Sequence, residues 1–211
     1  MCMTPAEVFA AVGTAGSSGV ASSAVVVGAG ALRLKPKFDA CGVRSVVWVE
    51  ARPWAVTYAR DKYPAIARFV LQACVGNTND KTVKFYELKP GYAAYSSCCP
   101  PRAQYARLRG YHLMRTVTLD SLLAQHRHCL PSAFASNQNF DLAWIDTCGS
   151  EMQVLEGMRA VPLLVYVRSY SGTHTGATTP DQLDAFFNAI GFSLVLTQNF
   201  PDGNSERVYK F

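Results

Sequence analysis

The sequence predicts an α/β fold in which a mostly parallel sheet carries helices on both faces and ends in an antiparallel hairpin. Two apolar runs, residues 24–30 and 45–50, have the composition of strands buried on both sides. The stretch 140–158 adds a third run, which ends at Asp146 and is followed by a helical pattern. Strands that alternate with helices in this way form parallel sheets.

The composition is that of a compact globular protein. The 211 residues suffice for one well-buried domain, and we expect a helix and flexible link over residues 1–22 before a single domain over 23–211. Hydrophobic residues make up 49% and charged residues 17%, which excludes a disordered chain. The net charge of +5 permits an anionic ligand without requiring nucleic acid.

The cysteines and the amino terminus indicate a reducing compartment. The seven cysteines include no Cys-x-x-Cys pair, and Cys98 and Cys99 are adjacent, so we expect free thiols. The first residues lack the pattern of a secretory signal, and no apolar stretch is long enough to span a bilayer. We therefore expect a cytoplasmic protein with no membrane partner.

Local patterns divide the amino-terminal half into short elements. Thr4-Pro5-Ala6-Glu7 is a helix start with a capping residue, a proline and an acid, whereas Pro36 disfavours the middle of a helix before Ala40. The expected elements are a helix from Thr4 to Val12, a link over 13–19, strands over 24–30 and 45–50, a helix over 53–63, and strands over 68–75 and 82–88.

The carboxyl-terminal half begins with an irregular segment, residues 89–110, and loops of this length are usually functional or disordered. The turn Pro201-Asp202-Gly203-Asn204 predicts a closing hairpin. The expected elements are a strand over 114–118, a helix from Leu119, a strand over 142–146, a helix over 150–158, a strand over 161–167, a helix over 179–191, and paired strands over 192–197 and 207–211.

A glycine loop and an acid follow the first two strands. Gly28, Ala29 and Gly30 come directly after the first strand, where glycines allow a ligand to approach the backbone. Arg33 stands where a dinucleotide fingerprint needs its third glycine. Glu50 ends the next strand about 20 residues on, where a carboxylate can accept both hydroxyls of a ribose. The alternatives are a plain turn and a solvated strand end.

Asp146 is the third candidate at a strand end. Open α/β sheets bind ligands at the carboxyl ends of their strands, so Asp146 is predicted to face a cofactor, a substrate or a metal. Alternatively, it caps the helix that begins near Ser150. Glu151 lies in the first turn of that helix, where an acid is favoured in any case. Cys148 has no basic partner nearby in the sequence, which favours a plain thiol over a nucleophile.

His174 lies in a polar loop after a strand and is either a general base or an ordinary loop residue. The other histidines suggest no metal site, because His126, His128 and Cys129 with Cys98 and Cys99 match no ordinary zinc spacing. We therefore predict no bound metal.

The densest basic run lies in and after the irregular segment. Arg102, Arg107, Arg109 and Arg115 alternate with aromatic residues there, and Tyr95 precedes them. The run is either a solvated face or a clamp on an anionic or sugar-like substrate, or on RNA.

The order of these motifs resembles the FkbM-type methyltransferases, a family with the Rossmann-like class I fold that uses S-adenosyl-L-methionine. The resemblance covers most of the chain, and its most specific part is TLDSLL followed further along by WID-x-x-G-x-E-x-x-VLEG. The motifs that carry it are VVVGAG at 25–30, VVWVEARP at 46–53, ACVGNTNDKTVKFYE at 73–87, VTLDSLL at 117–123, FDLAWIDTCGSEMQVLEG at 140–157 and GF at 191–192.

The resemblance implies a seven-stranded sheet with helices on both faces, and O-methylation of a hydroxyl on a small molecule, a sugar or a nucleotide-type acceptor. The catalytic candidates are Asp146, Glu151 and His174, and the substrate-binding candidates are Tyr95, Arg102 and Arg109. The residues expected to bind S-adenosyl-L-methionine are Gly28, Ala29, Gly30, Glu50, Ala51, Cys74, Val75 and Asp146.

Several positions depart from the family pattern. Val26 and Cys148 stand where the family usually has acids, Leu32 where it has a glycine, and Trp144 where a lysine is common. These departures leave two alternatives open, a non-catalytic or decayed binding protein on the same fold and an RNA-modifying methyltransferase. We expect a small-molecule or sugar-like acceptor as the partner and nucleic acid as a less favoured one, and a homodimer stays an open alternative.

Overall fold

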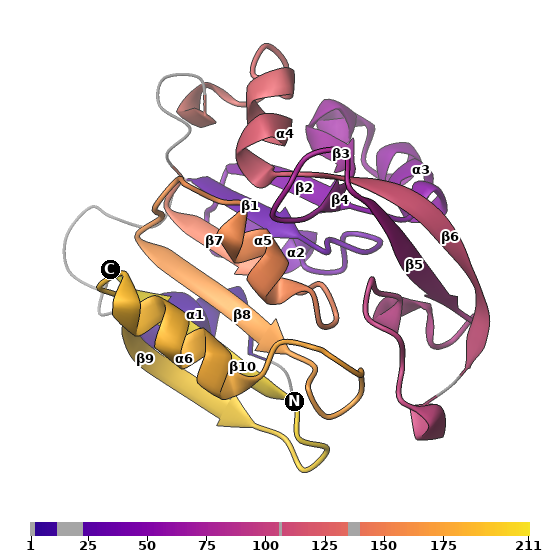
Figure 1. Cartoon of the computed structure of the whole chain (residues 1–211). Coiled ribbons are helices and arrows are strands. Elements are labelled where there is room, and N and C mark those ends of the chain that lie inside the picture. Colours follow the sequence, from indigo (N-terminus) through magenta and orange to yellow (C-terminus); the bar gives the residue numbers. More distant parts are fainter. Residues whose placement is uncertain (1–2, 12–22, 106, 135–139) are drawn as a thin grey trace.

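The computed structural model describes residues 3–11, 23–105, 107–134 and 140–211, and a seven-stranded sheet runs through its centre (Figure 1). The strand order is β3-β2-β1-β7-β8-β10-β9. The strands are β3 (Val70–Gln72), β2 (Ser45–Glu50), β1 (Ser23–Val27), β7 (Leu142–Ile145), β8 (Leu164–Ser169), β10 (Ser205–Lys210) and β9 (Ser193–Asn199).

The pairing confirms the predicted fold class. Strands β1, β2, β3, β7 and β8 are parallel, whereas β10 runs antiparallel to both β8 and β9. The order changes direction at β1, which pairs with β2 on one side and with β7 on the other. A crevice outside the carboxyl ends of the strands at such a point is where open α/β sheets bind ligands.

Helices cover both faces of this sheet because its strands are apolar on both sides. Along β1, Val25 and Val27 belong to one hydrophobic core, and Ala24 and Val26 belong to the other. The first core includes residues from α4 (Leu119–His126), α5 (Glu151–Glu156) and α6 (Pro180–Ala189). The second includes residues from α1 (Pro5–Ala11), α2 (Lys35–Ala40) and α3 (Pro53–Lys62).

Side-chain caps fix where several helices begin. The Glu7 carboxylate accepts from the Thr4 N–H at 2.6 Å at the start of α1, and Thr179 and Gln182 form a complete capping box at α6. Pro36 lies at the start of α2, where its missing N–H removes no helical hydrogen bond. The link predicted after α1 lies outside the described residues.

A second, three-stranded sheet in the order β4-β6-β5 corrects two predictions. The single strand predicted over 68–75 is wrong, because a 3₁₀ helix (Pro64–Phe69) precedes β3 and the chain then moves to the second sheet as β4 (Cys74–Val75). The irregular segment is shorter than predicted, since β6 (Leu108–Val117) begins within it and pairs with β5 (Thr82–Leu88). Most of β6 is exposed, so it carries no burial pattern that the sequence could show.

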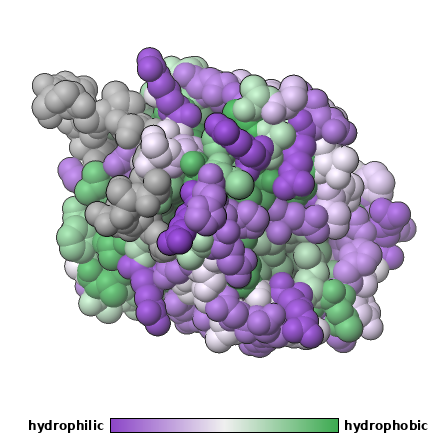
Figure 2. Space-filling model, turned by 90° about the horizontal axis from the view of Figure 1, so that it is seen from above, coloured by the Kyte–Doolittle hydropathy of each residue, from purple (hydrophilic) through white to green (hydrophobic). Residues whose placement is uncertain are grey.

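One face of the molecule is mainly polar (Figure 2). The face in Figure 2 is covered largely by hydrophilic side chains, with smaller hydrophobic areas between them. Within the described ranges, no helix is both long enough and apolar enough to cross a membrane.

Candidate functional site

The loop after β1 is tied tightly to its neighbouring strands. Gly28 has a φ of +84°, and a Cβ at this position would lie 1.9 Å from the backbone oxygen of Asp146. Only glycine therefore fits where β1 passes the end of β7. The N–H groups of Gly28 and Ala29 both donate to the Val49 carbonyl, at 2.9 and 3.0 Å, and the Gly30 N–H donates to Glu50 Oε2 at 2.6 Å.

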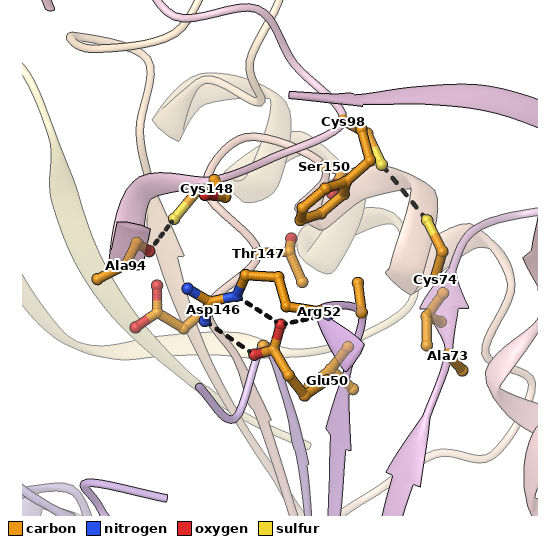
Figure 3. A pocket seen from close by; sticks show the side chains of 16 residues that line it. Glu50, Arg52, Ala73, Cys74, Ala94, Cys98, Asp146, Thr147, Cys148 and Ser150 are labelled. Carbon is orange, nitrogen blue, oxygen red and sulfur yellow. Dashed lines mark hydrogen bonds and ion pairs between the residues drawn. The ribbon is translucent and has the colours of Figure 1, made fainter. Parts of the chain in front are cut away.

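Glu50 is fully engaged by the chain's own groups. Its Oε1 accepts from the Arg52 N–H at 2.9 Å and from Arg52 Nε at 2.8 Å, and its Oε2 accepts from Arg52 Nη2 at 3.1 Å. Both side chains are buried, with residue exposures of 4% for Glu50 and 8% for Arg52. The bidentate pair is visible in Figure 3, where the guanidinium extends between Glu50 and Asp146.

Two adjoining cavities open at the carboxyl ends of the parallel strands. The small cavity has about 50 Å³ of space open to water, and the large one has about 870 Å³. The small cavity is lined by Glu50, Ala51, Ala73, Cys74, Val75, Phe85 and Cys98, among others, and the large one by Ala29, Gly30, Trp54, Tyr95, Arg109 and Tyr170, among others. Gly28, Arg52, Ala94 and Asp146 line both and so form the wall between them.

Asp146 stands at the junction of the two cavities. Its Oδ1 accepts from the Tyr170 hydroxyl at 2.6 Å. The protein atoms packed around the carboxyl group raise its pKa, and the nearby Arg168 opposes that shift. A raised pKa makes the Asp146 carboxylate a better proton acceptor than an exposed aspartate would be.

Residues 93–98, which we call the cover segment, close the small cavity from above. The carbonyl of Ala93 accepts from Arg52 Nη1, and the carbonyl of Ala94 accepts from Cys148 Sγ at 3.3 Å (Figure 3). The Ser97 hydroxyl donates to the Thr147 carbonyl at 3.3 Å. The cover segment is therefore held by Arg52, which follows β2, and by Thr147 and Cys148 in the loop after β7.

Glu151 lies behind the cleft and supports the loop that follows β7. It is fully buried, and its Oε1 accepts from the Thr147 N–H at 3.2 Å, from the Thr147 hydroxyl at 3.2 Å and from the Gly149 N–H at 2.8 Å. Burial raises the pKa of Glu151 to about 7, against the lowering effect of these N–H donors. Its carboxylate lines neither cavity, so the geometry gives it a positioning role.

His174 connects two loops at the rim of the site. Its Nε2 lies 3.0 Å from the Tyr95 carbonyl, which can only accept, so Nε2 carries the proton. Its Nδ1 lies 3.0 Å from the Thr173 hydroxyl. Burial lowers the pKa of His174, which keeps the ring neutral near pH 7. Nε2 thus holds the cover segment, while Nδ1 is paired with Thr173 in the histidine's own loop.

The substrate-binding candidates separate in space. Tyr95 and Arg109 line the large cavity, and Arg109 Nη1 lies 3.6 Å from Glu87 Oε1. Arg102 lines neither cavity and instead donates from Nη2 to the Ser171 carbonyl at 2.8 Å. The basic run therefore does not converge on these two cavities, since Arg109 borders the large one and its other members border neither.

Two departures from the family pattern coincide with unusual backbone. Leu32 has a φ of +55° and Cys148 a φ of +58°, a region in which L-residues other than Asn and Asp are uncommon. A glycine, as the family has at the position of Leu32, would adopt this conformation without strain. Leu32 is completely buried, so its packing offsets the strain.

The sequence did not reveal the role of Arg52. Its spacing from Glu50 was visible in VVWVEARP, and two residues along an extended chain can reach back to a carboxylate. Nothing in the sequence showed that the guanidinium would turn toward Glu50 rather than toward solvent. The contacts of the cover segment were equally hidden, because they join residues far apart in the chain.

Comparisons with known proteins give likenesses of fold. No protein-family model and no curated protein matches the chain. Among solved structures, the precorrin-6y C5,15-methyltransferase of Geobacter metallireducens has a TM-score of 0.48 and 10% identity, over 98% of this chain and 87% of its own. A putative RNA methyltransferase of Pyrococcus horikoshii has a TM-score of 0.49 and 11% identity, over 98% and 82%.

A TehB-like SAM-dependent methyltransferase of Corynebacterium glutamicum has a TM-score of 0.48 and 10% identity, over 99% of this chain and 88% of its own. These values are too low to transfer a reaction or a substrate. What this chain does must follow from its own cleft.

Proposed function

We propose that the chain is an S-adenosyl-L-methionine-dependent methyltransferase that methylates a hydroxyl oxygen of a small-molecule or sugar-like acceptor. The observation that carries the proposal is the placement of Glu50. Its carboxylate ends β2, accepts from the Gly30 N–H at 2.6 Å and lines a cavity whose wall includes Asp146. An acid at this point can bind the two hydroxyls of a ribose.

The donors of the glycine loop favour an adenosyl cofactor over a nucleotide. A pyrophosphate needs free backbone N–H groups, but those of Gly28, Ala29 and Gly30 already donate to Val49 and Glu50. A nucleoside without phosphates makes no such demand. The small cavity offers Ala73, Val75 and Phe85 as apolar neighbours for a base. The chemical types of the residues present therefore suit S-adenosyl-L-methionine, with an acid for the ribose and apolar neighbours for the base.

Binding requires Arg52 to leave Glu50. The small cavity, at about 50 Å³, cannot hold a nucleoside, since ligand pockets usually measure roughly 300 to 1,000 Å³. Movement of Arg52 and of the cover segment at Ala94 would remove the wall that separates the two cavities. We infer that the structure represents a closed state, in which Arg52 occupies the place of the ribose hydroxyls.

The groups near Asp146 suit methyl transfer to oxygen. S-adenosyl-L-methionine supplies an electrophilic methyl group when bound. The large cavity would hold the acceptor, with Tyr95 and Arg109 at its wall. Asp146 would accept the hydroxyl proton, and Tyr170 would orient that carboxylate through its 2.6 Å hydrogen bond. Glu151 and His174 would act by positioning the loops, which supplies the alignment that such transfers need.

The second candidate is a non-catalytic binding protein on the same fold. The bidentate Arg52–Glu50 pair favours it, because a permanent ion pair at this position would exclude a ribose. Cofactor binding and turnover separate the two candidates.

The test is calorimetric titration of S-adenosylhomocysteine into three proteins. Arg52→Met should bind about tenfold more tightly than the wild type, because no arginine competes for Glu50. The double variant Arg52→Met/Glu50→Gln differs from it by one charge and should bind about 100-fold more weakly than Arg52→Met, since two charge-assisted hydrogen bonds are lost. Equal binding by both variants, or none by any, would refute the ribose role. Binding without turnover of any acceptor would favour the second candidate.

A further inference from the structure

Two thiols meet in the small cavity, one from its floor and one from its cover. Cys74 Sγ lies 3.4 Å from Cys98 Sγ, and both residues line the cavity. Cys74 belongs to β4, whereas Cys98 ends the cover segment. Figure 3 shows the two side chains pointing toward each other across the cavity.

We propose that Cys74 and Cys98 form an oxidisable dithiol, which hydrogen peroxide converts into a disulfide that locks the cover segment over the small cavity. The consequence for cofactor binding rests on the proposed function, whereas the oxidation itself does not.

The cavity admits the oxidant and excludes larger molecules. Its space of about 50 Å³ accommodates a molecule of the size of hydrogen peroxide, but not a nucleoside. The hydrogen bond from Cys98 lowers the pKa of Cys74, so Cys74 is the first of the pair to become a thiolate. A thiolate is the form that attacks peroxides.

The reaction balances with one peroxide and no other reagent. The Cys74 thiolate attacks one peroxide oxygen, the O–O bond breaks, and hydroxide leaves and takes up the proton that Cys74 lost, giving a sulfenic acid and water. Cys98 then gives up its proton and attacks the Cys74 sulfur, and the sulfenic hydroxyl leaves with that proton as a second water. Two thiols are oxidised and one peroxide is reduced.

The neighbouring thiols are less suited to this reaction. Burial raises the pKa of Cys99 to about 11, and its Sγ contacts the Gly176 carbonyl at 3.9 Å. Burial also raises the pKa of Cys148, whose Sγ donates to the Ala94 carbonyl at 3.3 Å. Among the cysteines that the structure describes, neither sulfur has a thiol contact like the one between Cys74 and Cys98.

The effect on the site follows from where the bond would lie. The cover segment is now held over the cavity by hydrogen bonds and one thiol contact, all of which can open. A covalent link from Cys98 to β4 cannot open without a reductant. It would fix one end of the cover next to Val75 and Ala73, where the proposed cofactor's base would enter.

Peptide mapping tests the oxidation directly. Trypsin places Cys74 in residues 69–81 and both Cys98 and Cys99 in residues 85–102. The Cys99→Ser variant therefore leaves Cys98 as the one cysteine of its peptide. After treatment of the folded protein with one equivalent of hydrogen peroxide, we expect these two peptides to be disulfide-linked in the wild type and in Cys99→Ser. The control Cys98→Ser should give no such pair. A Cys98–Cys99 bond in the wild type, or unlinked peptides, would overturn the proposal.

A binding arm tests the lock. Oxidised Cys99→Ser should bind S-adenosylhomocysteine at least about tenfold more weakly than the reduced protein, and dithiothreitol should restore binding. The variant Cys98→Ser/Cys99→Ser should bind equally before and after peroxide. A linked pair without a change in affinity would overturn the lock. If the reduced protein binds no S-adenosylhomocysteine, the proposed function fails, while mapping still decides the oxidation.

Discussion

The two cavities share a wall but differ in how their polar groups are used. In the small cavity, the Glu50 carboxylate accepts four hydrogen bonds from Gly30 and Arg52, and the two thiols contact each other. In the large cavity, Arg109 has a side chain that is 65% exposed and makes one loose ion pair with Glu87. Glu50 and the two thiols of the small cavity are thus paired within the protein, whereas Arg109 at the large cavity is mostly exposed to solvent.

This difference indicates in which cavity a ligand must displace contacts within the protein. A ligand of the large cavity can approach the charge of Arg109, which water already solvates. A ligand of the small cavity must replace an ion pair that the fold has formed for itself, and it must supply hydrogen bonds of equal quality.

The largest effect is expected from Glu50→Gln, which leaves the buried Arg52 without a charged partner. We expect the free energy of unfolding to fall by about 3 to 5 kcal/mol in urea denaturation. The double variant Glu50→Gln/Arg52→Met removes both charges and should be more stable than Glu50→Gln alone. If the double variant is no more stable, Arg52 is not held in the small cavity by Glu50.

The next largest effect concerns Glu151, behind the loop that lines the small cavity. Its pKa of about 7 in the folded protein lies above the value of 4.5 expected when unfolded. A raised carboxyl pKa means that the folded state favours the protonated form, so stability is full below pH 4.5 and declines as the pH rises toward 7. The loss should reach about 3 kcal/mol.

Glu151→Gln keeps an acceptor oxygen and cannot ionise, so it provides the control. Its stability should be much flatter than that of the wild type between pH 4.5 and 7, and higher at pH 8. The measurement is the difference in unfolding free energy between the two proteins at several pH values. Parallel pH profiles would show that Glu151 is not a protonated, buried acid.

The smallest effect is expected in the large cavity. Arg109→Gln should change the free energy of unfolding by less than about 1 kcal/mol, because the Arg109 side chain is 65% exposed and its ion pair with Glu87 is 3.6 Å long. It should also leave the affinity for S-adenosylhomocysteine unchanged. A tenfold loss of that affinity would place the cofactor in the large cavity instead of the small one.

The parallel core could be predicted because its signals are local. Runs such as 45–50 are apolar on both faces, and Glu50 and Asp146 were recognised as strand ends from the sequence alone. The extent of β6 could not be predicted, because an exposed strand lacks the alternation that burial imposes. The split of the predicted third strand into β3 and β4 depends on a second sheet that only tertiary pairing creates.

The candidate site, like the fold, has features that the sequence predicts and features that it does not. The convergence of Gly28, Glu50 and Asp146 follows from topology, since parallel strands end at one edge. The actual partners of these groups depend on side-chain rotamers and on segments distant in the sequence. Arg52 on Glu50, and His174 on the carbonyl of Tyr95, are contacts of that kind. Residue type alone does not distinguish a ligand-binding acid from one that the fold has already paired.

The close approach at Gly28 has a mechanical consequence. With 1.9 Å between a hypothetical Cβ and the Asp146 backbone oxygen, the ends of β1 and β7 lie as near as their main chains allow. The main chains of these strands thus form a rigid floor of the small cavity, which does not rearrange to admit a ligand. Any widening of the small cavity must therefore come from Arg52 and the cover segment. These two parts would then control the entry of a ligand.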